Sequence, residues 1–178
     1  MRLPNLILAA AASLGLAGPA AAGYRDIAVP IGVAVNLDLK RYLGKWYEIA
    51  RFPNRFERGC AGVTADYALR PDDRITVVNT CRKGGLDGPV EVAKGVAEPV
   101  APGKLEVTFV PWLPFAKGDY WVLHVDPAYS FAVVGEPSGK TGWILARAPR
   151  LAPEKYDKAI SVLQSMGYDT AKLERVAH

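Results

Sequence analysis

Short segments in which apolar and polar residues alternate follow one another along most of the chain, and turn-forming residues separate them. Alternation with a period of two predicts a β-strand with one covered face, as where Leu105, Val107 and Phe109 alternate with polar residues. Turn signals recur about every eight to twelve residues, which is typical of successive antiparallel strands. We expect strands at residues 44–51, 61–69, 75–81, 90–97, 104–110, 120–126, 130–136 and 142–148.

A longer helical pattern lies near the C-terminus. Tyr156, Ile160 and Leu163 recur at helical spacing after Pro153, and Gly167 suits the position just past the end of a helix. Eight strands joined by short connections predict an all-β fold, an eight-stranded antiparallel up-and-down barrel with a C-terminal α-helix packed outside. We expect residues 23–178 to form this single domain.

The first predicted strand, 44–51, has a pattern in which neither face is plainly polar. Trp46, Glu48 and Ala50 share one face when the residues alternate with a period of two. A large indole near Gly44, which lets other parts of the chain pass close by, suits a plug at the closed end of a barrel. The alternative is an ordinary buried tryptophan in the core of any all-β protein.

The N-terminus has the three parts of a secretory signal peptide. Arg2 supplies a positive charge, residues 6–17 are uncharged and largely apolar, and residues 20–22 offer a small-residue cleavage site. A membrane anchor is the alternative, but the apolar run is shorter than the roughly 20 residues that span a bilayer. We therefore expect residues 1–22 to be a signal peptide. Because Gly23 stands where a lipoprotein needs a cysteine, we expect a soluble periplasmic or secreted protein without a lipid anchor.

Export changes the interpretation of the two cysteines, Cys60 and Cys81. An oxidising compartment allows a pair of thiols to persist as a disulfide. The two residues flank two predicted strands that a short turn at 70–73 joins, so antiparallel pairing brings them opposite or diagonal to one another. We expect a disulfide; two separate buried thiols are the alternative.

Composition and charge exclude some classes of partner. The 178 residues, 50% of them hydrophobic, suffice for one domain with a sizeable core. The net charge is +4 and the pI is about 9.1, but Lys and Arg are scattered among acidic residues. Scattered charge is typical of a solvated surface. We expect no nucleic-acid partner, and a weak contact with a membrane surface stays open.

Three separated stretches resemble the signature motifs of the lipocalins in order and position. They are GKWYE at 44–48, DPAY at 126–129 and Arg147 after the last predicted strand. Longer stretches, KRYLGKWYEIARF at 40–52, FERG at 56–59 and GDYWVL at 118–123, resemble the bacterial lipocalin group. Relatives of that group include plant temperature-induced lipocalins and apolipoprotein D. The resemblance covers residues 33–176.

The resemblance implies a barrel that is closed at one end, open at the other, and binds small lipophilic molecules. It implies that Trp46 and Arg147 stack at the closed end in a structural role. Bacterial lipocalins are associated with fatty acids and lysophospholipids and with membrane maintenance under stress. Two features depart from the pattern: the lipoprotein signal is missing, and the pair Cys60 and Cys81 is not part of the motif.

An apolar cavity with a few polar groups would bind such a ligand. The candidates for its wall are Ala50, Tyr67, Val77, Phe109 and Val122. The candidates for its mouth are aromatic residues in predicted loops, namely Phe52, Phe56, Trp112 and Phe115. The polar residues that alternation points inward are Glu48, Asn79, Tyr120 and His124. The alternatives are plain core for the wall residues and an internal hydrogen-bond network for the polar ones.

Enzyme chemistry has little support in the sequence. Serines occur outside any nucleophile-elbow context, and the cysteines and histidines lack metal-ligand spacing. We therefore expect no catalytic residues, no metal and no cofactor. A lipid-modifying enzyme using Glu48, Tyr120 or His124 is the rival, and haem binding through His124 is a third possibility. A homodimer through the aromatic rim also stays open.

Overall fold

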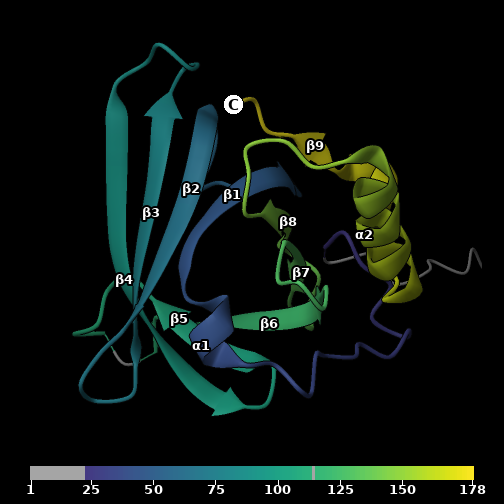
Figure 1. The fold of residues 1–178 in the computed structure, drawn as a ribbon, viewed down its shortest axis with the longest axis horizontal. Coiled ribbons are helices and arrows are strands. Elements are labelled where there is room, and N and C mark those ends of the chain that lie inside the picture. Colours follow the sequence, from purple (N-terminus) through teal and green to yellow (C-terminus); the bar gives the residue numbers. More distant parts are fainter. Residues whose placement is uncertain (1–22, 114) are drawn as a thin grey trace, which may run out of the picture.

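The computed structural model describes residues 23–113 and 115–178, so the predicted signal peptide lies outside the described residues. Eight antiparallel strands close into a barrel, and helix α2 packs on its outside (Figure 1). The strands are β1 (Gly44–Arg51), β2 (Cys60–Leu69), β3 (Ile75–Lys83), β4 (Val90–Ala101), β5 (Lys104–Thr108), β6 (Gly118–Val125), β7 (Phe131–Gly135), β8 (Gly142–Ala146) and the short β9 (Glu174–Arg175). The helices are α1 (Leu39–Tyr42), α2 (Pro153–Ser165) and the 3-10 turn η1 (Thr170–Lys172). The predicted fold class is confirmed.

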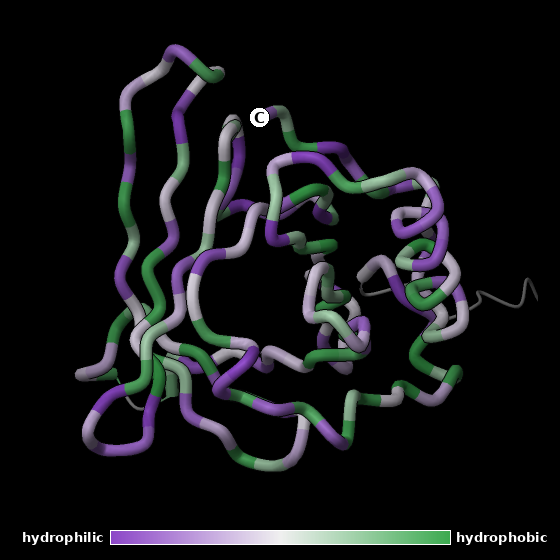
Figure 2. Tube along the Cα trace, viewed as in Figure 1, coloured by the Kyte–Doolittle hydropathy of each residue, from purple (hydrophilic) through white to green (hydrophobic). Residues whose placement is uncertain are grey.

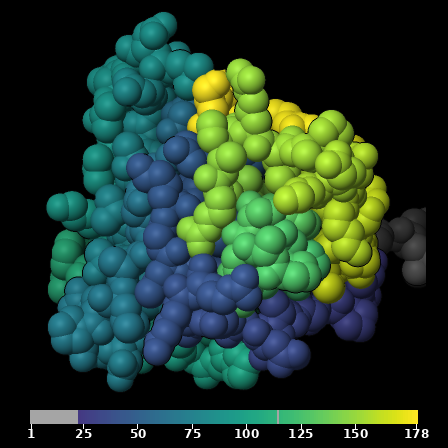
Figure 3. Space-filling model, viewed as in Figure 1, coloured from purple at the N-terminus to yellow at the C-terminus, as the bar shows by residue number. Residues whose placement is uncertain are grey.

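The barrel is closed because β1 pairs with both β8 and β2, while the strands from β2 to β8 pair with their sequence neighbours. Loops therefore alternate between two ends. The end that holds Trp46 also holds α1, and loops 52–59, 84–89 and 109–117 lie at the opposite, open end. The hairpin of β3 and β4 stands out beyond the rest of the molecule (Figure 3), and hydrophobic and hydrophilic residues alternate along it (Figure 2).

Two β-bulges decide which residues face the interior. The register of β1 against β8 shifts between Glu48 and Ala50, and that of β6 against β7 shifts between Val122 and His124. A bulge adds one residue to one strand, so the side chains that follow it change face. Simple alternation therefore fails at the middle of both strands.

The buried apolar side chains form two separate clusters. The inner cluster lies inside the barrel and consists of Tyr42, Trp46, Tyr67, Ile75, Val77, Ala97, Leu105, Val122, Tyr129, Ala132, Val134 and Leu145. The outer cluster lies between the barrel and α2 and consists of Ile49, Ala50, Phe52, Leu123, Phe131, Val133, Ile144, Ala146, Ala159, Leu163 and Tyr168. The wall formed by β6, β7, β8 and the end of β1 is thus buried on both faces.

Helix α2 begins and ends as the sequence predicts. Pro153 occupies its first turn, where a missing N–H leaves no hydrogen bond unmade, and Gly167 just past the end has φ +84°. Ala159 and Leu163 are fully buried against the barrel. The following Tyr168 hydroxyl donates to backbone carbonyls of the β7–β8 loop, and burial raises its pKa to about 12.

The C-terminal residues fill a seam in the barrel wall. β1 pairs with β2 only over Gly44–Tyr47, and beyond this point β9 pairs with Ala50 and Arg51. The Gly62 N–H donates to the Ala177 carbonyl (2.7 Å), so the tail bridges β1 and β2. Figure 1 shows the C-terminus beside the start of β2. Among the described residues, the helices are all too short or too polar to cross a membrane.

Candidate functional site

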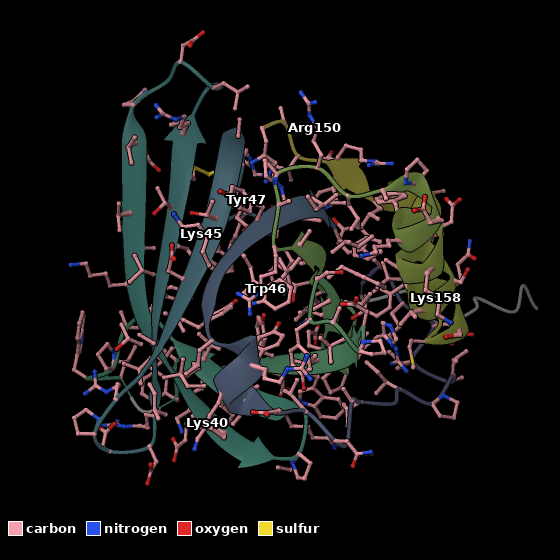
Figure 4. The ribbon with its side chains drawn as sticks, viewed as in Figure 1. Lys40, Lys45, Trp46, Tyr47, Arg150 and Lys158 are labelled. Carbon is pink, nitrogen blue, oxygen red and sulfur yellow. A yellow bond between two sulfur atoms is a disulfide. The ribbon has the colours of Figure 1, made fainter. Side chains whose placement is uncertain are left out.

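The closed end is stoppered by Trp46 and Arg147. The Arg147 guanidinium lies 3.8 Å from the centre of the Trp46 ring, and Trp46 is fully buried. Arg147 also donates to the carbonyls of Lys45 (2.7 Å) and Leu43 (2.8 Å), while the Trp46 indole N–H donates to the Tyr42 carbonyl (2.7 Å). Figure 4 shows Trp46 within the curve of β1. The predicted stacking at the closed end is confirmed.

The loop between β6 and β7 locks this stopper in place. Asp126 accepts hydrogen bonds from the Ser130 hydroxyl (2.8 Å) and the Phe131 N–H (2.9 Å). Partial burial pushes the pKa of Asp126 upward, but these hydrogen bonds and the charge of Lys155 outweigh it, so the pKa lies below its ordinary value. Tyr129 then adopts φ 56°, and its carbonyl accepts from Arg147 Nε at 3.4 Å. The DPAY motif thus holds Arg147 over Trp46.

Three tyrosines form the floor of the interior above the stopper. The Tyr120 hydroxyl lies 2.8 Å from that of Tyr42 and 2.9 Å from that of Tyr67. Burial raises the pKa of all three hydroxyls, so they stay uncharged at neutral pH. Trp143 from β8 stacks on Tyr120 with the ring centres 6.4 Å apart. The floor is therefore aromatic, but it carries neutral hydrogen-bonding groups.

A cluster of three charged groups lies between the floor and the open end. The buried Glu48 accepts from Arg51 Nη1 at 2.9 Å, and Arg51 Nη2 also donates to the Cys60 carbonyl. Glu57 reaches in from loop 52–59 and accepts from the Trp143 indole N–H at 3.0 Å. Burial, and after it the neighbouring Glu57 carboxyl, raises the pKa of Glu48 well above its ordinary value, against the opposing effect of Arg51. We call Glu48, Arg51 and Glu57 the charged cluster.

The opposite wall, formed by β2, β3 and β4, presents small side chains to the interior. Asn79 on β3 stands between Ala65 of β2 and Ala93 of β4. The next inward position on β4 is Gly95, where a Cβ would lie within 3.0 Å of the Phe109 ring. The Asn79 Oδ1 atom is buried and has no hydrogen-bond partner among the described residues. Small residues therefore line this wall, and at Gly95 the Phe109 ring occupies the place of a side chain.

The inward-facing residues at this level are reachable from solvent. Trp46 and Val122 near the closed end are fully buried, whereas Ala65, Asn79 and Tyr120 are only partly buried and Ala93 is exposed. Residues 90–94 of β4 are exposed on both faces, where the hairpin of β3 and β4 projects beyond the barrel. Burial of the inward-facing side chains therefore decreases from the closed end toward the open end.

The bulges overturn two of the predicted positions. Ala50 and His124 were expected to face the interior with Glu48 and Tyr120, but each follows a bulge and lies on the outer face. His124 packs beside Phe131, with the ring centres 5.4 Å apart. Its pKa is lowered by burial and by Lys158 of α2, which outweigh the opposite effect of Asp126.

The prediction that Phe52 belongs to the mouth is also wrong. Phe52 is fully buried in the outer cluster, between the rings of Tyr24 (5.0 Å) and Tyr168 (5.1 Å). Residues before β1 and after α2 cover it. No local signal at Phe52 predicts this, because both partners come from distant parts of the sequence.

The remaining predicted residues lie inside the barrel or at its open rim. Tyr67, Val77 and Val122 belong to the inner cluster, with Tyr120 packed against it. Phe56, Trp112 and Phe115 are exposed in loops at the open end, by 73%, 76% and 81%. Phe109, where β5 runs into loop 109–117, is 42% exposed.

The two cysteines form the expected disulfide. Cys60 and Cys81 are bonded, with their Cα atoms 5.4 Å apart, and they join β2 to β3 (Figure 4). Cys81 shares the inward face of β3 with Asn79. The disulfide therefore lies near the open end, where the Cys60 carbonyl also holds Arg51.

Three functional residues were missed by reasoning from the sequence: Arg51, Glu57 and Trp143. Arg51 was assigned to the other face of its strand, and the bulge after Glu48 brings it inward. Glu57 lies in a loop, where a carboxylate is usually solvated. Trp143 alternates with Leu145 in β8, which was a usable signal for an inward position.

Comparison with known proteins agrees with this architecture. Residues 37–178 match the model of the Lipocalin-like domain family. The chain is 39% identical to temperature-induced lipocalin-1 of Arabidopsis thaliana, over 80% of each chain, and 40% identical to the outer membrane lipoprotein Blc of Escherichia coli K12, over 80% of this chain and 81% of that one. It is 36% identical to apolipoprotein D of Mus musculus, over 79% and 77%.

Solved structures resemble the fold at lower sequence identity. Insecticyanin from the tobacco hornworm Manduca sexta superposes with a TM-score of 0.66 at 22% identity, and 88% of this chain and 87% of that chain are covered. Lobster apocrustacyanin A1 gives a TM-score of 0.63 at 18% identity, with 78% of each chain covered. Lipocalins bind small hydrophobic ligands, and the names of these relatives are not names of enzymes. The chain belongs to the lipocalin family.

Proposed function

We propose that this protein is a non-enzymatic carrier or store of lipids with a single acyl chain, either fatty acids or lysophospholipids. The observation that carries the proposal is the lipocalin barrel itself, which is closed by the buried Trp46 and whose inward-facing Ala65, Asn79 and Tyr120 are only partly buried toward the open end. Burial of an acyl chain there contributes about 0.8 kcal/mol for each methylene group removed from water. A chain of about twelve methylene groups would thus contribute about 10 kcal/mol, which is comparable with the cost of about 4 to 15 kcal/mol for the freedom lost on binding.

The open end supports a role at a membrane. The rim carries Phe56, Trp112 and Phe115, and exposed aromatic side chains partition favourably to a lipid–water interface. Beside the mouth lies a polar cleft of about 390 Å³, whose lining includes Arg55 and Arg58. These guanidinium groups suit the phosphate of a lysophospholipid or of a bilayer surface. We propose that the protein acts in the periplasm in membrane maintenance under stress, and collects its cargo at a bilayer.

A lipid-modifying enzyme receives less support. The rival would use Glu48, Tyr120 or His124, and the structure separates these candidates, because His124 lies on the outer face and the other two lie inside. The same position removes His124 as an interior ligand for haem. The exposed aromatic rim makes a homodimer through that rim an outcome to measure, by light scattering with and without lipid.

Native mass spectrometry tests the proposal. The protein is incubated with a total lipid extract, and the mass of any bound molecule is measured. We expect one single-chain lipid per protein. Ala65→Trp fills the interior and should abolish the adduct, whereas Ala68→Trp, on the exposed face of the same strand, should leave it unchanged. Equal binding by both variants would place the lipid elsewhere and refute the proposal.

A further inference from the structure

The chemistry of the barrel interior distinguishes among single-chain lipids by the charge of the head group. A carboxylate that enters a low-dielectric cavity needs a cation or several hydrogen-bond donors to replace its water. The charged side chains that face the interior below the rim are Glu48, Arg51 and Glu57. Any carboxylate head group would therefore have to find its counter-ion in this cluster.

The charged cluster offers no free positive charge. Arg51 is engaged by Glu48 at 2.9 Å and by the Cys60 carbonyl at 3.0 Å. With Glu48 protonated, as its raised pKa favours, the net charge of the cluster is zero, and with Glu48 ionised the net charge is negative. In neither state is it positive. At the rim, Lys83 lies 3.8 Å from Glu91, so it too has a carboxylate partner.

The other polar groups of the interior are uncharged and include a vacant acceptor. Asn79 Oδ1 is buried, and its neighbours across the strands, Ala65 and Ala93, cannot donate to it. The tyrosine hydroxyls of the floor bond to one another. A buried amide oxygen is stabilised by an N–H or O–H donor and repels a carboxylate.

We infer that the barrel selects single-chain lipids whose head group is uncharged and donates a hydrogen bond to Asn79, such as a long-chain alcohol or a monoacylglycerol, over ionised fatty acids. The inference rests on the proposed function and chooses among its ligands. A lysophospholipid shares the hydrogen-bond donor, because its glycerol hydroxyl lies between the acyl chain and the phosphate, and its charged phosphate would have to stay outside the interior.

Calorimetric titration with laurate, lauryl alcohol and monolaurin tests the inference, because the three share a chain length. At pH 8 the alcohol and monolaurin should bind at least about tenfold more tightly than laurate, the ratio expected when a charge loses its water without compensation. Laurate binding as tightly as the other two would overturn the inference and leave the carrier proposal standing. Failure of all three to bind would overturn the inference, and the adduct formed with the total lipid extract then decides the carrier proposal.

Two sets of variants assign the selectivity to named residues. Asn79→Leu should weaken monolaurin about tenfold, while Thr80→Val, the next residue on the outer face, should leave its affinity unchanged. Glu48→Gln combined with Glu57→Gln leaves Arg51 without a carboxylate, so laurate should gain about tenfold or more. An unchanged affinity for laurate in this folded double variant would contradict the account. If circular dichroism shows that the double variant does not fold, the relative affinities of the wild-type protein for laurate, lauryl alcohol and monolaurin decide whether the inference holds.

Discussion

Replacement of Arg147 by methionine should destabilise the barrel while it preserves the length of the side chain. The guanidinium lies over the Trp46 ring at 3.8 Å, an interaction that contributes about 1 kcal/mol in a partly exposed position. It also donates to the partly buried carbonyls of Tyr42 (3.2 Å) and Leu43 (2.8 Å). The carbonyls of Arg41 and Lys45 are exposed, and water replaces the donor there.

The loss of each partly buried hydrogen bond costs about 1 kcal/mol, so the expected decrease in the free energy of unfolding is about 3 kcal/mol. Arg147→Lys keeps the charge over the ring but loses the planar fork, and should lose about half as much. Urea unfolding followed by near-ultraviolet circular dichroism measures both. A double-mutant cycle with Trp46→Leu should give a coupling energy of about 1 kcal/mol. A stability of Arg147→Met within the error of wild type, or zero coupling, would refute the reasoning.

Three further predictions concern stability. The folded state holds the pKa of Asp126 below the ordinary carboxyl value of about 3.9, and this contributes stability above that value. The contribution is lost as the pH falls through the lower pKa, so Asp126→Asn should flatten the acid side of a pH–stability profile. A profile parallel to that of the wild type would count against this. Removal of the disulfide by Cys60→Ser with Cys81→Ser should lower the free energy of unfolding by about 3 kcal/mol, because the two residues are 21 apart in sequence. Thermal unfolding of the wild-type protein with and without reductant checks this prediction. An unfolding temperature that does not change with reductant would contradict it. Leu163 is fully buried on the face of α2 that packs on the barrel, so Leu163→Ala should lower the free energy of unfolding in urea by about 2 to 5 kcal/mol. The exposed control Ser161→Ala should lower it by less than about 0.5 kcal/mol. Equal losses would show that α2 is not docked as described.

Much of the closed end could be predicted from sequence because its motifs act locally or in pairs. The stacking of Trp46 with Arg147 followed from the resemblance to the lipocalin motifs. The disulfide between Cys60 and Cys81, which lies near the open end, followed from the antiparallel hairpin of β2 and β3. The start and the end of α2 could be predicted equally well, because proline is favoured in the first turn of a helix and glycine just past its last residue.

The open half could not be predicted in the same way, since single-residue bulges govern it. Ile49 and Leu123 look like any apolar strand residue, yet the register shifts at these positions send Ala50 and His124 outward and bring Arg51 in. A bulge depends on how two strands fit across the whole barrel, so the sequence around it carries little signal. The charged cluster was missed for this reason.

The central claim is that an acyl or alkyl chain lies inside the open half of the barrel. The most direct measurement is a crystal structure of the protein in complex with monolaurin. The account predicts a continuous chain between Ala65 and Ala93 on one side and Tyr120 and Trp143 on the other, with a head-group oxygen within hydrogen-bond distance of Asn79 Oδ1. A lipid bound only on the outer surface or the rim, with an interior that does not admit it, would contradict the account.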